Sequence, residues 1–260
     1  MNLNLNHKKA FVCGSTQGIG KAAAIELASL GCKVTLIARN EKKLKQVISE
    51  LPGSSGHDYI VADFTKPDEL KQAVEGYLEQ NEEVHILINN GGGPAPGPAL
   101  EASPENFINA FQQHLVCYQI LVQLTVPLMK KAGYGRIINI ISTSVKEPIR
   151  NLGVSNTIRG AVASWAKTLA AELAPFGITV NNILPGFTAT DRLQGLIESR
   201  SKNEGLSVEE VEKAMKNSVP AGRFADPSET AAAIAFLASE SAGYVNGVNL
   251  PVDGGKTGCL

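Results

Sequence analysis

The stretch KKAFVCGSTQGIGKAAA, residues 8–24, combines a short apolar run, a glycine-rich turn and the start of an alanine-rich segment. It predicts a strand over Lys8–Cys13 that passes directly into a helix over Gly18–Leu30. Glycines at such a turn let the backbone approach a pyrophosphate, and the helix N-terminus offers free N–H groups. The spacing G-x-x-x-G-x-G also fits a purely structural tight turn with close helix packing. The choice between these two interpretations depends on the rest of the sequence.

Outward from this turn, β-branched apolar runs alternate with longer amphipathic segments. After the first strand, further strands are predicted over Lys33–Ala38, Asp58–Ala62, Val84–Asn89, Arg136–Ile141, Thr179–Leu184 and Gly247–Val252. After the first helix, further helices are predicted over Glu41–Leu51, Pro67–Gln80, Pro104–Leu115 and on to Lys131, Gly153–Ala174 and Pro227–Ser239. This alternation predicts an α/β fold, a doubly wound parallel sheet with helices on both faces and right-handed crossovers.

One segment interrupts the alternation. Residues 191–217 are charged and helix-prone, and they follow the end of a predicted strand. Ligands of open α/β sheets bind beyond the carboxyl ends of the strands, so this segment is expected to form a small lid. Its apolar and basic residues Arg192, Leu193, Leu196 and Ile197 suit an acyl chain with an anionic group. Without repeats or linkers, residues 1–260 are expected to form a single domain.

The amino-acid composition argues against several classes of protein. With 24 Lys and Arg against 25 Asp and Glu, the net charge of −1 gives no electrostatic basis for binding nucleic acid or an anionic membrane. The cysteines, Cys13, Cys32, Cys117 and Cys259, have no metal or redox spacing, so no metal site and no disulfide framework is expected. A polar start and the lack of a long apolar run predict a cytoplasmic protein.

The end of the second predicted strand indicates which dinucleotide is bound. A carboxylate at this place typically holds the ribose 2′-hydroxyl of NAD, whereas here Ala38 is followed by Arg39. A guanidinium pairs well with a 2′-phosphate, which favours NADP(H) over NAD(H); the alternative is a solvated arginine. Asp63 and Asn89–Gly92 follow the third and fourth strands, at the edge where the glycine turn lies.

With these motifs, the sequence resembles the short-chain dehydrogenase/reductase superfamily over nearly its whole length, and most of all the 3-oxoacyl carrier-protein reductases of that superfamily. The matching segments are Gly14–Gly20, Asp63, Asn89–Gly91, Gly135–Asn139, Pro185–Gly186, Gly222–Phe224 with Pro227, and Val252–Gly255. The resemblance implies a seven-stranded Rossmann sheet, a homotetramer or homodimer, and hydride exchange between a nicotinamide and a small carbonyl or alcohol substrate.

By the same resemblance, Asp63 would hold the adenine and Asn90 would lie beside the adenosine ribose. Pro185, Gly186, Thr188 and Thr190 would border the nicotinamide. The full set of expected cofactor-binding residues is Gly14, Ser15, Gln17, Gly18, Ile19, Gly20, Arg39, Asp63, Phe64, Asn90, Gly91, Gly92, Arg159, Pro185, Gly186, Thr188 and Thr190.

The catalytic positions depart from the family, which uses Asn, Ser, Tyr and Lys. The serine is kept as Ser142, but Ser155 stands at the tyrosine position and Arg159 at the lysine position. Residues 155 and 159 still share a helix face. The asparagine position is occupied by His114.

This exchange removes the usual acid. A tyrosine phenol has a pKa of about 10, whereas a serine alcohol is a far weaker acid and a guanidinium does not release its proton. One hypothesis makes His114 the proton source, directly or through water and Ser155. Ser142 and Ser155 would then orient the carbonyl oxygen, and Arg159 would hold the nicotinamide ribose or a substrate anion. The alternative gives His114 a structural role. Tyr118 is expected inside a helix interface and Tyr134 at the surface.

Three functions stay open on these grounds. The first is an NADP(H)-dependent oxidoreductase that reduces a 3-oxoacyl thioester or a small ketone with a non-standard proton donor. The second is a catalytically silent nucleotide-binding regulator or partner subunit. The third is a lyase or isomerase that keeps the dinucleotide for structure. The intact cofactor end favours the first and the third over a pure scaffold.

Overall fold

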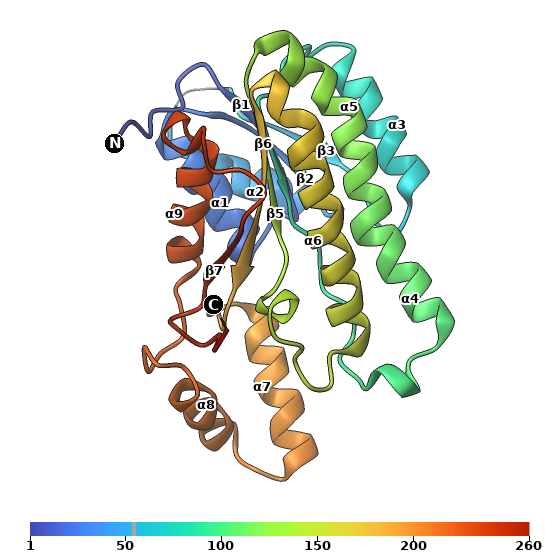
Figure 1. Cartoon of the computed structure of the whole chain (residues 1–260), viewed down its shortest axis with the longest axis vertical. Helices are drawn as coiled ribbons and strands as arrows, with labels where there is room; N and C mark the ends of the chain where they lie inside the picture. The colour runs from blue at the N-terminus through green and yellow to red at the C-terminus, as the bar shows by residue number, and fades with distance from the viewer. Residues whose placement is uncertain (54–55, 260) are drawn as a thin grey trace.

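The computed structural model describes residues 1–53 and 56–259, and its centre is a seven-stranded parallel sheet (Figure 1). The strand order is β3-β2-β1-β4-β5-β6-β7, which reverses direction between β1 and β4. The strands are β1 (Lys9–Cys13), β2 (Lys33–Ala38), β3 (Asp58–Val61), β4 (Ile86–Asn89), β5 (Gly135–Ile140), β6 (Ile178–Pro185) and β7 (Asn249–Val252). The predicted doubly wound Rossmann-type α/β fold is confirmed.

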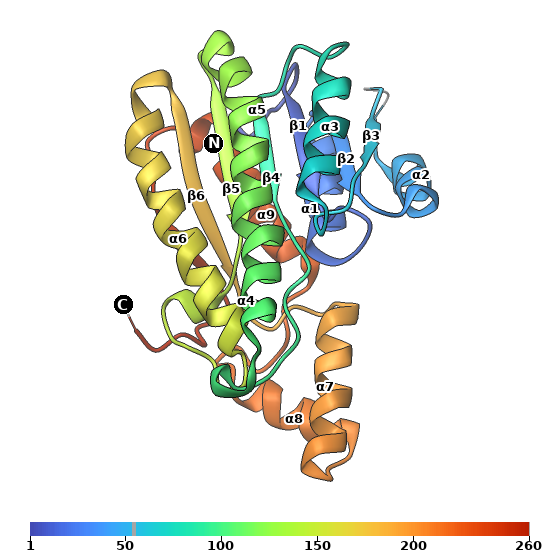
Figure 2. The same cartoon turned by 90° about the vertical axis from the view of Figure 1, so that its right-hand side faces the viewer.

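Helices cover both faces of the sheet (Figures 1 and 2). On one face lie α1 (Gly18–Ser29), α2 (Glu41–Glu50) and α9 (Pro227–Ala238). On the other lie α3 (Pro67–Leu78), α5 (Cys117–Ala132) and α6 (Gly153–Leu173), with α4 (Pro104–Phe111) at the end of α5. The strands are apolar on both sides because each side is buried beneath one of these layers.

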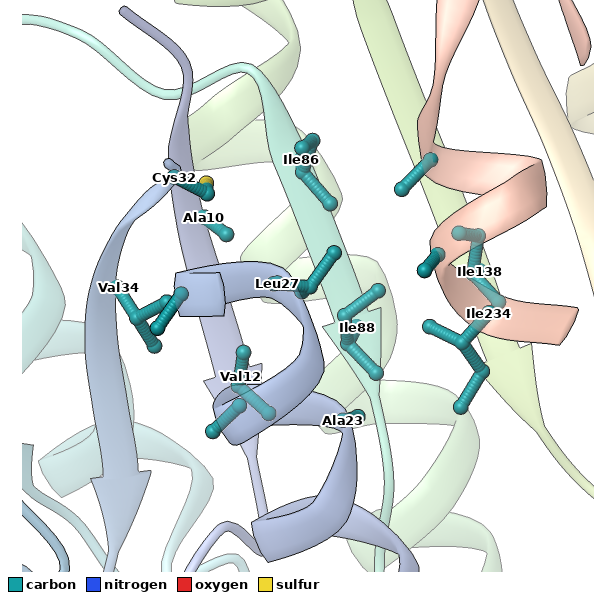
Figure 3. Packing of buried hydrophobic residues seen from close by; sticks show 14 of the residues in the cluster. Ala10, Val12, Ala23, Leu27, Cys32, Val34, Ile86, Ile88, Ile138 and Ile234 are labelled. Carbon is teal, nitrogen blue, oxygen red and sulfur yellow. The ribbon is translucent and has the colours of Figure 1, made fainter. Parts of the chain in front are cut away.

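The face under α1 and α9 shows how this burial is achieved. Val12 of β1 and Ile88 of β4 are fully buried against Leu27 of α1, and Ile138 of β5 packs against Ile234 of α9 (Figure 3). Burying a side chain of this kind contributes about 1.5–3 kcal/mol. The glycine turn before α1 is therefore anchored to the most buried part of the sheet.

A ladder of asparagine side chains crosses four strands. Asn89, Asn139, Asn182 and Asn249 are register partners on β4, β5, β6 and β7. Each Nδ2 donates to the Oδ1 of the next residue, at 2.8, 2.9 and 2.8 Å. Buried amides need partners, so the ladder favours one register of the sheet over a slipped one.

The two helices expected between Pro104 and Lys131 follow one another without a loop. A π-helical turn, Gln112–Val116, joins α4 to α5. This turn carries His114, so the expected catalytic position lies on an irregular turn within a continuous helical segment. Such π-helical turns are found frequently at functional sites.

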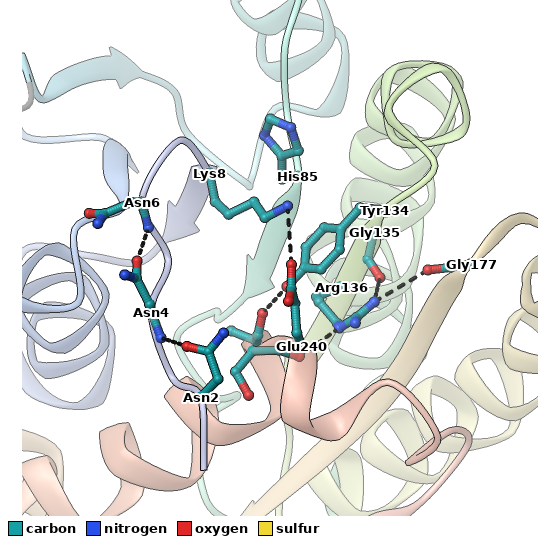
Figure 4. Close-up of polar contacts among 12 residues, drawn as sticks. Asn2, Asn4, Asn6, Lys8, His85, Tyr134, Gly135, Arg136, Gly177 and Glu240 are labelled. Atoms are coloured by element: carbon teal, nitrogen blue, oxygen red, sulfur yellow. Dashed lines mark hydrogen bonds and ion pairs between the residues drawn. The ribbon is translucent and has the colours of Figure 1, made fainter.

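The expectation of a surface Tyr134 is wrong. Its side chain is only 9% exposed, and its hydroxyl donates to the Ala238 carbonyl at 2.5 Å (Figure 4). Lys8 Nζ lies 3.9 Å and Arg136 Cζ 4.1 Å from its ring centroid. Burial raises the pKa of Tyr134 to about 12. This tyrosine joins β5 to the C-terminal end of α9, far from Ser142.

Residues 191–217 form α7 (Asp191–Glu204) and α8 (Val208–Asn217), which extend beyond the carboxyl ends of the strands (Figures 1 and 2). Leu193 and Ile197 of α7 pack against Val211 and Met215 of α8. Within residues 1–53 and 56–259, no helix is long and apolar enough to cross a membrane.

Candidate active site

A cavity of about 520 Å³ lies at the carboxyl ends of β1 and β4, against the start of α1. Gly14 has a φ of +57°, and a Cβ there would lie 2.7 Å from the Asn90 carbonyl oxygen. A Cβ on Gly20 would overlap the Gly14 carbonyl oxygen. Asn90 Nδ2 donates to that same oxygen at 3.2 Å. The turn is closed so tightly that only glycine fits at these two positions.

The residues around this cavity fit a dinucleotide. No side chain caps the N-terminus of α1, so its first N–H groups are free to bind phosphate. Ser15 Oγ, within the turn, is buried without a hydrogen-bond partner among the described residues. Arg39 lies on the lining and is exposed. Asp63 accepts a hydrogen bond from Thr65 N at 2.9 Å, which together with Arg39 lowers the pKa of the carboxyl.

Most of the expected cofactor-binding residues meet at this cavity. The ones that line it are Gly14, Gln17, Gly18, Ile19, Arg39, Asp63, Phe64, Asn90, Gly91, Gly92 and Thr190. Ser15 and Gly20 lie in the turn itself without lining the cavity, whereas Pro185, Gly186, Thr188 and Arg159 line a neighbouring one.

That neighbouring cavity, of about 210 Å³, brings together Ser142, Ser155 and Arg159. It shares five lining residues with the first cavity: Ile19, Asn90, Gly91, Thr190 and Arg192. The two spaces therefore adjoin, and a dinucleotide in the first can extend toward the serines in the second.

The two serines come from different elements. Ser142 follows β5, and its Oγ accepts a hydrogen bond from Ser144 N at 3.0 Å, which leaves its own proton to donate. Ser155 lies in the first turn of α6 and is 6% exposed. Arg159, one turn further along α6 and also 6% exposed, donates from Nη1 to the Ile140 carbonyl at 3.1 Å. This hydrogen bond fixes the guanidinium beside the end of β5.

His114 does not join this group. It lies outside the lining of both cavities and is 1% exposed. A Cβ on Gly91 would lie 2.9 Å from His114 Cε1, so the ring sits behind the backbone of Gly91. Its Nδ1 lies 3.3 Å from the Tyr118 hydroxyl, which is fully buried as expected for a helix interface. Burial, and next the charge of Arg159, lowers the pKa of His114 to about 2. The ring is neutral at neutral pH.

This pKa predicts a pH dependence of folding. The unfolded chain takes up a proton on His114 near its ordinary pKa of 6.5, and the folded chain does not. The contribution of His114 to the free energy of unfolding is therefore fully present above about pH 6.5 and is lost as the pH drops. The loss is about 2 kcal/mol between roughly pH 7.5 and pH 5. In urea unfolding at these two pH values, we expect His114→Asn to lose less stability on acidification by about this amount. The exposed His7→Asn is the control, and an unchanged pH dependence in His114→Asn would contradict the burial argument.

Two groups at the second cavity carry information that sequence reasoning used incompletely or missed. Arg192 is one of the residues of the expected lid, and the structure lays its guanidinium against Gly93, where a Cβ would overlap it. Lys256 was not expected in the site, yet it lines this cavity. The available signal was its place directly after the Val252–Gly255 segment, at the carboxyl end of the last strand.

The sheet order, the glycine turn and the two adjoining cavities define a Rossmann-type fold suited to a dinucleotide, and the comparisons with known proteins agree. The sequence model of a family described as Enoyl-(Acyl carrier protein) reductase matches residues 14–257. The chain belongs to the short-chain dehydrogenase/reductase superfamily, with an overall likeness to its 3-oxoacyl carrier-protein reductases, and it is an enzyme of this oxidoreductase type.

Particular relatives cover nearly the whole chain. NADPH-dependent reductase BacG of Bacillus subtilis is 32% identical over 255 residues, which are 97% of this chain and 98% of that protein. 3-Oxoacyl-[acyl-carrier-protein] reductase FabG of Haemophilus influenzae is 35% identical over 250 residues, 95% and 97% of the two chains. L-sorbose reductase from Gluconobacter frateurii, solved in complex with NADPH and L-sorbose, superposes with a TM-score of 0.93 at 28% identity and full coverage of both chains.

Proposed function

We propose that this protein is an NADP(H)-dependent reductase of a small carbonyl compound, in which Ser142 keeps the family's serine, and Ser155 and Arg159 stand in place of its Tyr and Lys. The observation that carries the proposal is the second cavity, where Ser142, Ser155 and Arg159 lie together beside a cavity that fits a dinucleotide. Its support from relatives is that BacG is an NADPH-dependent reductase and that the sorbose reductase binds NADPH.

When bound, the nicotinamide dinucleotide supplies the hydride that reduces the carbonyl carbon. In this scheme the hydroxyls of Ser142 and Ser155 donate hydrogen bonds to the carbonyl oxygen. These bonds strengthen as negative charge develops on that oxygen. Arg159 is almost fully buried, and its positive charge lowers the free energy of the same negative charge. The proton for this oxygen comes from solvent: the Ser155 hydroxyl passes its own proton to the oxygen as it takes one from a water molecule, so that no free serine alkoxide forms.

His114 enters this scheme as a neutral hydrogen-bonding residue behind Gly91. Donation from an imidazolium would need a protonated ring, and burial keeps the pKa of His114 near 2. Its role is then to hold the Tyr118 hydroxyl and the π-helical turn. On this basis, a pH–rate profile without an ionisation near pH 6.5 is expected. The homotetrameric or homodimeric state and the cytoplasmic location stay predictions.

The direct test of the function combines binding and turnover. NADPH and NADH are titrated separately while their fluorescence is followed, and NADPH oxidation is then measured with a panel of small ketones and 3-oxoacyl thioesters. The proposal expects tighter binding of NADPH than of NADH and oxidation with at least one carbonyl compound. Tight NADPH binding without oxidation across the panel would instead support a silent nucleotide-binding protein.

The preference for NADP(H) predicts the effect of replacing Arg39. A guanidinium on a phosphate group contributes about 1.5–3 kcal/mol, which corresponds to roughly a 10- to 100-fold difference in Kd. We therefore expect Arg39→Ala to weaken NADPH binding by about this factor and to change NADH binding by less than about threefold. Lys42→Ala, an exposed cation of α2 outside the cavity lining, is the matched control. Equal losses for both dinucleotides would remove the argument for a 2′-phosphate contact.

A further inference from the structure

The second cavity carries an excess of positive charge that the chain as a whole does not have. Arg159, Arg192 and Lys256 line it, and no Asp or Glu is among its lining residues in the part of the chain that the structure describes. The net charge of the whole chain is −1. Three cations without a carboxylate in one small space require an explanation.

The two arginines have no ionic partner inside the protein. None of the ion pairs formed by residues 1–53 and 56–259 includes Arg159 or Arg192. Arg159 donates to a backbone carbonyl, and Arg192 lies against Gly93, whose missing side chain leaves room for the guanidinium. Burial and the charge of Arg159 both lower the pKa of Arg192. Two like charges close together are unfavourable unless an anion lies near them.

The other walls of the cavity describe the remainder of the ligand. They are apolar at Ile141, Ile149, Leu152, Phe187, Leu193 and Leu196. An inorganic anion would leave these side chains in contact with water, whereas an organic acid would cover them. The cavity is therefore matched to a molecule with an anionic end and an apolar body.

Resting on the proposed function, we infer that the carbonyl substrate is itself an anion, a 2-oxo or 3-oxo carboxylate with an apolar substituent, whose carboxylate is held by Arg192 with Arg159. A guanidinium binds a carboxylate through two parallel N–H···O bonds, which fixes the carbonyl in one orientation. Arg192 also lines the dinucleotide cavity, so a phosphate of the cofactor is the competing anion for it. Of these two cavities, Lys256 and the apolar side chains line only the second. They therefore favour the substrate over the cofactor as the source of the anion.

The test compares benzoylformate with its methyl ester, which keeps the ketone and the ring and removes the charge. Binding of each to the NADP⁺-saturated protein is measured by calorimetry, and NADPH binding is measured separately by fluorescence. We expect benzoylformate to bind at least about tenfold more tightly than the ester. Arg192→Ala is expected to remove this preference and to leave the Kd of NADPH within about twofold of its original value. Arg192→Lys is expected to keep part of the preference for the acid over the ester. Arg200→Ala, on the same helix but outside this cavity, is the control.

Equal binding of acid and ester by the unmodified protein would overturn the inference. The inference would also be overturned if Arg192→Ala weakened the binding of NADPH but kept the preference for the acid over the ester. The arginine would then bind a phosphate of the dinucleotide. Either result leaves the proposed function intact if a neutral ketone is still reduced. Conversely, tight and Arg192-dependent binding of benzoylformate without oxidation of NADPH by any carbonyl compound would support the anion site and contradict the reductase.

Discussion

Alanine at Gly20 is expected to raise the Kd for NADPH by about 100-fold or more, a loss of at least about 2.7 kcal/mol of binding free energy. The added Cβ would overlap the Gly14 carbonyl oxygen and lie 2.7 Å from Asn90 Nδ2. Both atoms are fixed: Gly14 has a φ of +57°, and Asn90 Nδ2 donates to the Gly14 oxygen at 3.2 Å. Relief of the overlap moves the N-terminus of α1 away from the turn, and with it the N–H groups that would bind phosphate.

Gly160→Ala is the matched control for this substitution. Gly160 is also a helix glycine, in α6, and a Cβ added there has no atom within 4 Å. Alanine is a better helix former than glycine by about 1 kcal/mol, so this variant should be at least as stable as the unmodified protein and bind NADPH normally. Fluorescence titration gives both Kd values, and thermal unfolding separates lost binding from lost folding. Normal NADPH binding by folded Gly20→Ala would show that the turn does not hold the dinucleotide.

The part of the site that sequence reasoning found depends on local patterns. Gly14–Gly20 and Arg39 each follow a strand directly, and the carboxyl ends of parallel strands meet at one edge of the sheet. The order of strands and helices was predictable for the same reason, with differences of one or two residues at their ends. The strand expected from Val84 begins at Ile86, for example, although the backbone of His85 still bonds to both neighbouring strands, donating to the Lys9 carbonyl and accepting from Arg136 N, each at 2.9 Å.

What sequence reasoning missed depends on contacts between distant segments. Arg192 lies against Gly93, nearly a hundred residues earlier, and no local pattern records that contact. His114 was placed correctly on a helix near the site, but whether its ring enters the cavity or lies behind Gly91 depends on a π-helical turn that has no sequence signature here. Tyr134 was expected at the surface because its cover, Lys8 and Ala238, comes from both ends of the chain.

The asparagine ladder is a case in which the signal was present and unused. Asn89, Asn139 and Asn182 are buried in β4, β5 and β6, Asn249 begins β7, and a buried amide is costly unless it is hydrogen-bonded. Four of them in neighbouring strands of a parallel sheet predict one another as partners. Their side-chain bonds at 2.8–2.9 Å place the ends of β5 and β6, and so Ser142 and Pro185, at a fixed offset.

Replacing both serines by alanine is expected to lower kcat by about 10³-fold or more, because removing a single hydrogen-bond donor to a developing oxyanion usually costs about 10²–10³-fold. Each single variant should have a smaller effect, because one hydroxyl and the charge of Arg159 remain in the cavity. The Kd for NADPH should stay within about twofold, since neither serine lines the dinucleotide cavity. Steady-state NADPH oxidation with a carbonyl compound the protein reduces, together with fluorescence titration, measures both quantities.

Two further variants separate this chemistry from structure. Ser142 also accepts a hydrogen bond from Ser144 N, so Ser142→Ala loses a cap worth about 1 kcal/mol of folding free energy. Ser142→Thr keeps the hydroxyl and should retain most of the activity, whereas Ser164→Ala, an exposed serine on α6, should change nothing. If the double alanine variant kept its kcat, the oxygen of the substrate would not lie between these serines. The search for the proton donor would then move to Lys256, the lining cation that is able to release a proton, since an arginine does not.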